Sequence, residues 1–328
     1  MEPLLKVENL RIELTTRTGV APVIDNLSFE LAAGESISFV GESGCGKSMT
    51  ALGIMGLLPE KVGRIASGSI KFNGEELTTA SPKRLRDIRG NDISMIFQEP
   101  MTSLNPVYTV GEQIAEVIRA HQGLSRKAAW NQAIELLDAV RIPNAKGRVS
   151  DYPFQMSGGQ RQRVMIAIAL ACEPKILIAD EPTTALDVTV QAQIFDLLND
   201  MKRQTGASII MITHDMGAVA EMAERMIVMY AGRKAEEGPV EQTIDHPRHP
   251  YTRGLISCVP HIMSTISEER HALTEVPGIV PSLSDFGQNR CLFASRCNMV
   301  TQKCLEERPP EKLFANGQKA ACWFAEEV

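Results

Sequence analysis

Residues 41–48 read Gly-Glu-Ser-Gly-Cys-Gly-Lys-Ser, the complete pattern of a phosphate-binding loop. The apolar stretch Ser36–Val40 precedes it as an expected strand, and a helical pattern runs from Lys47 to Leu58, where Pro59 stops it. Glycines let backbone N–H groups approach phosphate oxygens closely, and the positive end of the following helix adds to the attraction. We therefore predict a nucleotide site formed by Gly41, Glu42, Ser43, Gly44, Cys45, Gly46, Lys47, Ser48 and Met49.

Three side chains of this loop have separate interpretations. Lys47 is expected to bridge the outer phosphates, and the Ser48 hydroxyl to bind Mg²⁺. Cys45 is interpreted as a tolerated small side chain rather than a redox centre. The loop alone indicates a nucleotide-binding protein, which is a large class.

A pair of carboxylates follows a second apolar strand, Lys175–Ala179. In an open parallel sheet, ligands lie beyond the carboxyl ends of the strands, so Asp180 and Glu181 should lie beside the phosphate loop. We expect Asp180 to hold Mg²⁺ and Glu181 to act as the general base on the attacking water.

Two further polar side chains also follow apolar strands. His214 comes after Ser208–Thr213 and is predicted to contact the γ-phosphate as a third catalytic residue. Gln98 comes after Ile93–Phe97 and can reach the same metal or water, although its case from the sequence alone is weak.

Residues 157–160 read Ser-Gly-Gly-Gln and open a helical pattern that ends before Pro174. A helix N-terminus binds phosphate, and this one lies far along the chain from the phosphate loop. We therefore expect it to serve a nucleotide held by another subunit; the simpler alternative is a glycine turn in which the serine caps its own helix. The residues concerned are Ser157, Gly158, Gly159 and Gln160.

The remaining patterns predict an α/β fold. Apolar and polar residues alternate over the first forty positions, which predicts antiparallel strands near the nucleotide, and buried-type strands alternate with helices, which predicts a parallel sheet. Amphipathic spacing between Gly111 and Val140 predicts a helical subdomain at about 100–160, and residues 227–238 a closing hairpin. We divide the chain into an ATPase domain, 1–245, and a small cysteine-rich domain, 246–328.

Charge and hydropathy exclude several classes. The net charge is −6 and the densest basic run, Lys83–Arg86, is followed by an aspartate, so nucleic acid is not an expected partner. The longest apolar run, Val164–Cys172, is far shorter than the ~20 residues of a membrane span. Met1–Lys6 lacks the pattern of a secretory signal, so we expect a cytoplasmic chain with at most a peripheral membrane role.

The ordered set of motifs resembles the ATPase domain of ABC transporters over residues 4–240. It comprises the phosphate loop, Gln98, the turn at 157–160, Asp180–Glu181, Ala185-Leu186-Asp187 and His214. The resemblance implies a head-to-tail dimer that encloses two ATP molecules, each between one chain's phosphate loop and the other chain's glycine turn. Asp187 would then lie at the dimer interface.

Two further segments, Gln98–Pro106 and His249–Thr252, together with the cysteine-rich tail, are similar to the ATPase subunits of dipeptide, oligopeptide and nickel importers. This implies a second, non-identical ATPase chain, two membrane permeases and a periplasmic or extracellular solute-binding protein, with this chain at the cytoplasmic face of the membrane. The sequence departs from the family pattern at two places. Met156 stands before the turn at 157–160, where leucine is commoner, and Arg11–Leu14 lacks the aromatic residue that stacks on adenine in this family.

Four cysteines lie in the tail, and no two of them have the short spacing of a zinc-binding pair. Disulfides are disfavoured in a reducing cytoplasm. Spacing leaves open metal-bound and unligated thiols; the resemblance favours a 4Fe-4S cluster over zinc. The candidate ligands are Cys291, Cys297, Cys304 and Cys322, whereas Cys172 and Cys258 are interpreted as packing residues.

The main hypothesis is an ATP-hydrolysing subunit that powers the import of dipeptides or oligopeptides. Import of nickel or another small solute by the same machinery is the first alternative. A soluble ABC ATPase acting on nucleic acid is disfavoured by the acidic charge, and a redox sensor with a degenerate ATPase by the intact Glu181.

Overall fold

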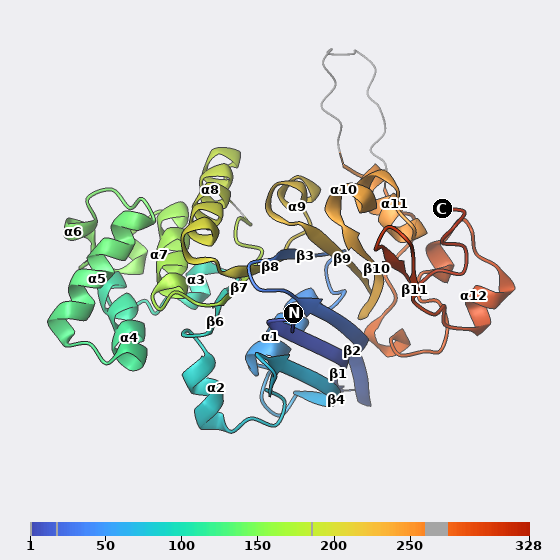
Figure 1. Ribbon diagram of the computed structural model, residues 1–328, viewed down its shortest axis with the longest axis horizontal. Coiled ribbons are helices and arrows are strands. Elements are labelled where there is room, and N and C mark those ends of the chain that lie inside the picture. The colour runs from blue at the N-terminus through green and yellow to red at the C-terminus, as the bar shows by residue number, and fades with distance from the viewer. Residues whose placement is uncertain (1, 18, 185, 260–274) are drawn as a thin grey trace, which may run out of the picture. The chain divides into compact units, whose positions relative to one another are not determined.

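The computed structural model describes residues 2–17, 19–184, 186–259 and 275–328 (Figure 1). They form two compact units. The first unit comprises Met1–Leu5, Leu31–Ser36 and Phe72–Ile212, and the second unit comprises Lys6–Glu30, Ile37–Lys71 and Thr213–Val328. The boundary predicted at 245/246 lies inside the second unit and stays a prediction.

The first sheet of the second unit contains β1 (Leu5–Thr16), β2 (Gly19–Leu31) and β4 (Gly63–Phe72), in the order β2-β1-β4. The alternating pattern of the sequence is present in β1, with Leu5, Val7, Leu10 and Ile12 buried. The alternation shifts by one residue at Asn9, which has a φ of 50°. Such a left-handed residue inserts an extra position into a strand and returns the apolar side chains to the core face.

The second sheet of this unit has the order β11-β12-β10-β9-β3. Its strands are β3 (Ser36–Val40), β9 (Arg225–Tyr230), β10 (Arg233–Pro239), β11 (Lys312–Leu313) and β12 (Lys319–Ala320). β3 runs parallel to β9, and β9 and β10 form the predicted antiparallel hairpin. β12 pairs antiparallel with β10, so the C-terminal region extends this sheet.

The helices of the second unit are α1 (Lys47–Met55), α9 (Met216–Met222), α10 (Val240–Asp245), α11 (Pro250–Ser257) and α12 (Gln302–Glu306). The predicted end of α1 at Leu58 is wrong. Gly56 adopts the left-handed conformation, and its N–H donates to the carbonyls of Gly53 and Leu52, which terminates the helix before Pro59 is reached.

Aromatic side chains join the phosphate-loop strand to the C-terminal region in one core. Tyr230 packs edge-on against Tyr251 and Phe293, with ring centroids 4.6 and 5.2 Å apart. Val40 and Val228 belong to the same buried cluster.

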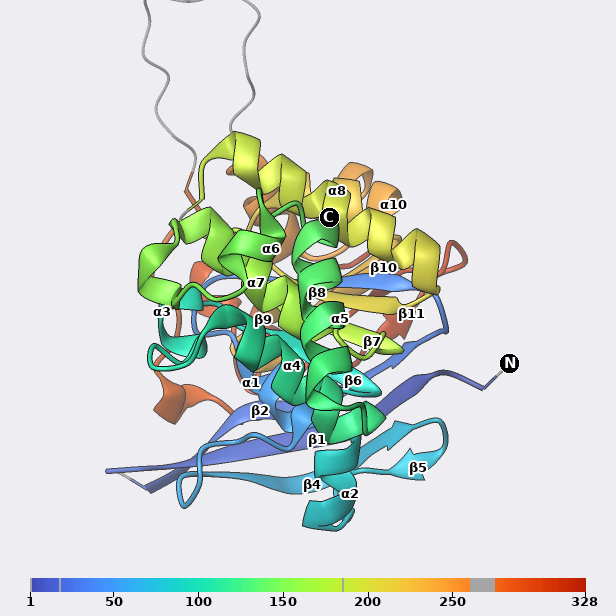
Figure 2. The same ribbon diagram turned by 90° about the vertical axis from the view of Figure 1, so that its left-hand side faces the viewer.

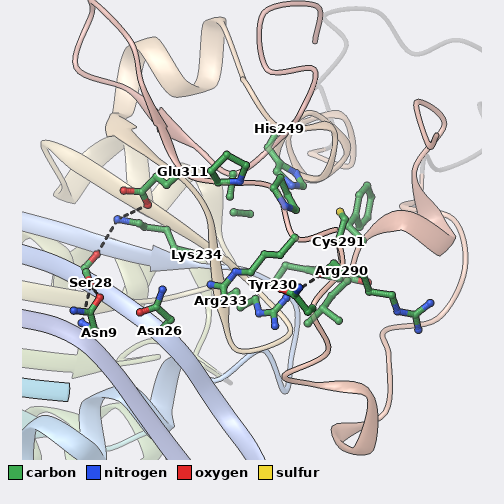
Figure 3. Close-up of a pocket in the computed structure, with 18 residues that line it drawn as sticks. Asn9, Asn26, Ser28, Tyr230, Arg233, Lys234, His249, Arg290, Cys291 and Glu311 are labelled. Carbon is green, nitrogen blue, oxygen red and sulfur yellow. Dashed lines mark hydrogen bonds and ion pairs between the residues drawn. The ribbon is translucent and has the colours of Figure 1, made fainter. Parts of the chain in front are cut away.

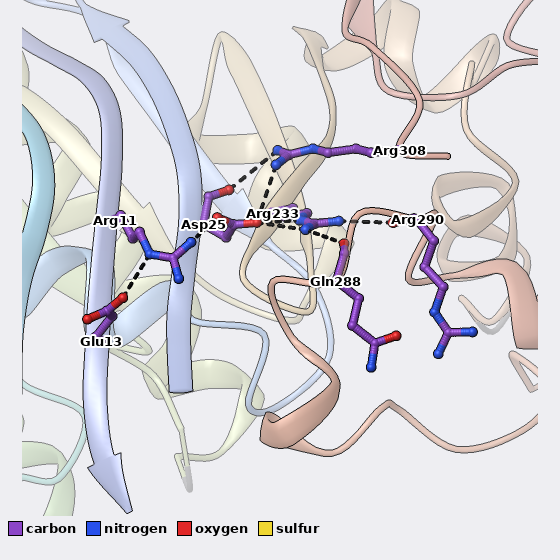
Figure 4. Close-up of polar contacts among 7 residues, drawn as sticks. All are labelled: Arg11, Glu13, Asp25, Arg233, Gln288, Arg290 and Arg308. Atoms are coloured by element: carbon purple, nitrogen blue, oxygen red, sulfur yellow. Dashed lines mark hydrogen bonds and ion pairs between the residues drawn. The ribbon is translucent and has the colours of Figure 1, made fainter. Parts of the chain in front are cut away.

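A buried carboxylate links β2 and β10 to the C-terminal region of the second unit (Figure 4). Asp25 Oδ2 accepts hydrogen bonds from Arg233 at 2.8 Å and Arg308 at 3.3 Å, and Oδ1 accepts one from Arg11 at 2.9 Å. Arg233 also donates to the carbonyls of Gln288 and Arg290. One acidic side chain therefore holds three guanidinium groups.

The first unit contains three parallel strands, β6 (Ile93–Ile96), β7 (Ile176–Asp180) and β8 (Ser208–Ile212). Every residue of these strands is buried, as expected for a parallel sheet with covered faces. The long helix α8 (Val188–Thr205) connects β7 to β8. The predicted parallel arrangement is therefore confirmed for these three strands.

The same unit contains further helices, one before β6 and the others, including those predicted between Gly111 and Val140, between β6 and β7 (Figure 2). They are α2 (Pro82–Ile88), α3 (Pro100–Ser103), α4 (Val110–Gln122), α5 (Arg126–Ala139), α6 (Ala145–Arg148) and α7 (Gly158–Leu170). Helices α4, α5 and α7 pack together through apolar faces that include Ile114, Ile118 and Leu137. Among the helices within the described ranges, none combines the length and the apolarity needed to cross a bilayer.

Candidate functional site

The phosphate loop connects β3 to α1 and holds its lysine against its own backbone. The buried Lys47 Nζ donates to the carbonyls of Gly41 at 2.6 Å and Glu42 at 3.1 Å. Ser43 and Gly44, at the crest of the loop, are exposed. The loop thus presents its backbone to solvent with a fixed positive charge beneath it, which suits a polyphosphate.

Cys45 is buried in this loop, and its carbonyl accepts a hydrogen bond from Gly232 N at 3.0 Å. Burial raises the pKa of the Cys45 thiol, with Lys47 acting in the opposite direction. A neutral buried thiol is a poor nucleophile, which favours the packing interpretation of this residue.

The predicted carboxylate pair lies at the end of β7. Asp180 is buried, and Glu181 has a φ of 45°, a conformation that is strained for a non-glycine residue. Gln98 Nε2 and Thr184 Oγ1 each donate to Glu181 Oε2 at 2.9 Å. The structure therefore places Gln98 against Glu181, although the sequence offered only weak support for a role of Gln98. It also places Thr184 there, a residue that sequence reasoning missed.

These two contacts orient the Glu181 carboxylate at the carboxyl end of a parallel strand, where a general base would be needed. The sequence also predicts that Asp180 and Glu181 lie beside the phosphate loop, but they belong to the first unit and the loop belongs to the second. That position stays a prediction.

The turn at 157–160 caps its own helix. Ser157 Oγ accepts from Gln160 N at 3.3 Å, and Gln160 Oε1 accepts from Ser157 N at 3.1 Å. The serine N-cap of the simpler alternative is thus present, and contact with a nucleotide on another subunit stays a prediction. Ser157 and Gly158 are exposed, and a side-chain carbon built on Gly158 would meet open space, so the end of α7 is accessible to a phosphate.

Asp187 also caps a helix, because its Oδ1 accepts from Val190 N at 2.9 Å at the start of α8. Its predicted place at a dimer interface is not tested by these contacts.

His214 follows β8 and is exposed. It lines a cavity of about 250 Å³ together with Gly41 and Glu42 of the phosphate loop. The structure therefore brings His214 to the start of the loop. Cys258 lines the same cavity and is partly exposed, so it is not a simple core residue.

The four tail cysteines line one cavity, with His249, Phe293 and Trp323 among its walls. Cys291 N donates to Cys304 O at 3.0 Å. Within the described ranges, however, no three His, Cys, Asp or Glu side chains converge so as to hold a metal ion. The cysteines gather as predicted, but a metal role for them is not confirmed.

Burial controls the protonation of two of these thiols. It raises the pKa of both Cys291 and Cys322 to about 11, and neighbouring cysteines add to the shift. These two thiols are consequently protonated at neutral pH, and a metal that bound them would have to displace those protons.

A larger cavity of about 440 Å³ adjoins the cysteine cavity, since His249, Cys291 and Phe293 line both (Figure 3). Lys234 on its wall is paired: its Nζ donates to Ser28 O at 2.8 Å and lies 2.9 Å from Glu311.

Sequence reasoning also missed two residues that contact the phosphate loop from the C-terminal region. Arg296 forms an ion pair with Glu42, and Tyr251 OH accepts a hydrogen bond from Glu42 N. For Tyr251 the sequence offered the His249–Thr252 segment, which carries the family resemblance but had no predicted role.

Two family models match this chain. The model described as ABC transporter matches residues 24–184, and the one described as oligopeptide/dipeptide transporter, C-terminal region, matches residues 235–304. The oligopeptide transport ATP-binding protein OppD of Haemophilus influenzae is 48% identical over 327 residues, covering 100% of this chain and 99% of that protein. A putative peptide import ATP-binding protein of Brucella abortus (strain 2308) is 48% identical over 98% of this chain and 94% of its own length.

Solved structures agree with the fold. The dimeric ATP-binding cassette MJ0796, in a post-hydrolysis state bound to ADP and Pi, has a TM-score of 0.65 and 29% identity, covering 72% of this chain and 98% of its own. The cbiO1 protein from Clostridium perfringens, part of the ABC transporter complex cbiONQ, has a TM-score of 0.62 and 27% identity over 75% of this chain and 92% of its own.

Proposed function

This chain belongs to the ATP-binding subunits of oligopeptide and dipeptide ABC importers, and we propose that it hydrolyses ATP to power peptide uptake. The observation that carries this function is the full-length similarity to OppD, 48% over 100% of the chain. It includes the C-terminal region as well as the nucleotide-binding cassette.

In this function the phosphate loop holds the ATP phosphates, with Lys47 as the cation that bridges them. The Ser48 hydroxyl, Gln98 and Asp180 are the oxygen ligands proposed for Mg²⁺, which neutralises charge that develops on the phosphates. Hard oxygen donors of this type suit that ion. His214 is proposed to contact the γ-phosphate, and its shared cavity with Gly41 supports that role.

Glu181 is proposed as the general base that takes a proton from the attacking water. Its support is geometric: Gln98 and Thr184 both donate to Oε2, which holds that oxygen in place. Fixed orientation matters because a base must lie within hydrogen-bond reach of the proton that it removes.

We further propose that two ATPase chains assemble head to tail, so that Ser157 to Gln160 of one chain contact ATP on the other. The exposed N-terminus of α7 supports this arrangement, as does the dimeric state of the solved relative. The second chain is proposed to be homologous but not identical. Two membrane permeases and a solute-binding protein complete the machine, and this chain then lies at the cytoplasmic face of the membrane.

We propose that the four tail cysteines hold a 4Fe-4S cluster. The cavity shared by the four cysteines supports this proposal. Anaerobically purified protein should then be brown, whereas colourless protein with one equivalent of zinc would refute the proposal.

Reconstitution tests the peptide function. The chain, the proposed partner ATPase and two permeases should hydrolyse ATP in proteoliposomes faster when a peptide-loaded binding protein is added. Stimulation by a nickel-loaded binding protein and not by peptide would support the alternative cargo. A complex that purifies with nucleic acid and lacks permeases would refute the import function.

A further inference from the structure

The Glu42 side chain, in the phosphate loop, is held by an arginine from the C-terminal region. Arg296 Nη1 donates to Glu42 Oε2 at 2.7 Å, and Nη2 donates to Oε1 at 2.9 Å. The Arg296 side chain is only 2% exposed, against 28% for Glu42. Two parallel, charge-assisted hydrogen bonds of this kind fix both the position and the plane of a carboxylate.

The backbone of the same residue is held independently. Glu42 N donates to the hydroxyl of Tyr251 at 2.8 Å. Tyr251 is completely buried and packs against Tyr230 and Phe293, so its hydroxyl has little freedom to move. Residues 251 and 296 thus fix the first turn of the loop from one side.

Arg296 is itself rigidly placed. Its guanidinium also donates to the carbonyls of Pro277 at 2.7 Å and Val276 at 3.0 Å. Gly278 has a φ of +82°, and a side-chain carbon there would lie 3.1 Å from Arg296 Cγ. The backbone around 276–278 is therefore shaped to let this side chain pass to Glu42.

Each side of the contact has a reason to matter for nucleotide binding. The loop must present its N–H groups in one conformation, and a loop that is fixed before binding loses less entropy when the phosphates arrive. A glutamate beside a site for several phosphate charges is repulsive unless a cation compensates it. Arg296 meets both needs at once.

We propose that Arg296 and Tyr251 are positioning residues for ATP: they hold the phosphate loop at Glu42 and keep its carboxylate neutralised. The inference rests on the proposed ATPase function. It assigns to the C-terminal region a direct part in nucleotide affinity, in addition to whatever the cysteines bind.

The test measures the dissociation constants of ATP and adenosine by titration calorimetry on the full-length chain. Arg296→Ala should weaken ATP binding about tenfold, or about 1.4 kcal/mol, and leave adenosine binding unchanged. The double variant Arg296→Ala with Glu42→Gln should regain most of the loss, because the freed side chain is then neutral. Arg290→Ala is the matched control, since Arg290 contributes its backbone carbonyl, as an acceptor for Arg233, and it should bind ATP normally.

Tyr251→Phe serves as a second variant because it removes one hydroxyl and retains the ring packing; it should weaken ATP binding about threefold. The inference is overturned if folded Arg296→Ala and Tyr251→Phe both bind ATP within twofold of wild type. It is equally overturned if the double variant is as weak as Arg296→Ala, because the charge would then be irrelevant. Wild-type protein that binds no ATP would instead refute the proposed function.

Discussion

Asp25→Asn should destabilise the second unit strongly, although the two side chains have the same shape. Asp25 as a whole residue is 7% exposed, and its side chain, like that of Arg233, is 10% exposed. The amide removes the negative charge and turns an NH₂ group toward guanidinium donors. The buried Arg233 then retains its two carbonyl acceptors but has lost its counterion.

The magnitude follows from the burial of each pair. Removing one partner of a buried ion pair costs about 3–5 kcal/mol, because the remaining charge stays desolvated. Arg11 and Arg308 have side chains that are 35% and 30% exposed. Solvent screens them, so each adds less than about 1 kcal/mol. We expect a total loss of about 4 kcal/mol.

Thermal unfolding followed by circular dichroism measures this loss. A domain of 150–250 residues shifts its midpoint by roughly 2–4 °C per kcal/mol, so the expected decrease is about 10 °C. Glu75→Gln is the control, since Arg84 holds that carboxylate through Nε and Nη2, the two nitrogens by which Arg233 holds Asp25, but the side chains of this pair are about 40% exposed. A shift for Asp25→Asn no larger than for Glu75→Gln would refute the argument that burial, and not geometry, decides the value of these pairs.

Glu181→Gln should lower kcat by about 10²–10⁴ with ATP affinity retained; steady-state hydrolysis at a near wild-type rate would show that another group is the base. Thr184→Val should lower kcat less than Glu181→Gln, because only one of the two hydrogen bonds to Oε2 is lost. Cys297→Ser should reduce the visible absorbance of anaerobic protein, and an unchanged spectrum would remove Cys297 from the ligand set. Burial lowers the pKa of His249 to about 4, below the ordinary value of about 6.5, so the folded state favours neutral histidine. The free energy of unfolding should therefore decrease by up to about 3 kcal/mol as the pH falls from 6.5 to 4. His249→Asn, which retains a helix cap, should flatten that part of the urea-unfolding profile; parallel profiles would contradict the linkage. Burial raises the pKa of Glu236 to about 7, so its contribution to stability increases as the pH falls. That contribution is present in both the wild type and the variant, and it cancels when their profiles are compared.

Local patterns were sufficient for most of the elements that surround the nucleotide. A strand before the phosphate loop, a helix after it and carboxylates at the end of β7 follow from periodicity and from backbone chemistry within a few residues. The helix end was misplaced because a proline is the more visible stop signal, whereas Gly56 acts through a backbone conformation. Cysteine spacing left metal-bound and unligated thiols open, and the choice of an iron–sulfur cluster over zinc came only from a family resemblance.

The sequence by itself predicted the chemistry proposed for this protein: a loop for phosphates, a carboxylate to act as a base, and a helix N-terminus to bind a phosphate. Only the tertiary structure decided how those groups are oriented. Gln98 reaches Glu181 across 83 positions, and Arg296 reaches Glu42 across 254. Contacts at that separation depend on how sheets and loops pack. Periodicity cannot predict them, because the pattern around each residue reflects its own strand, helix or loop and carries no information about a distant partner.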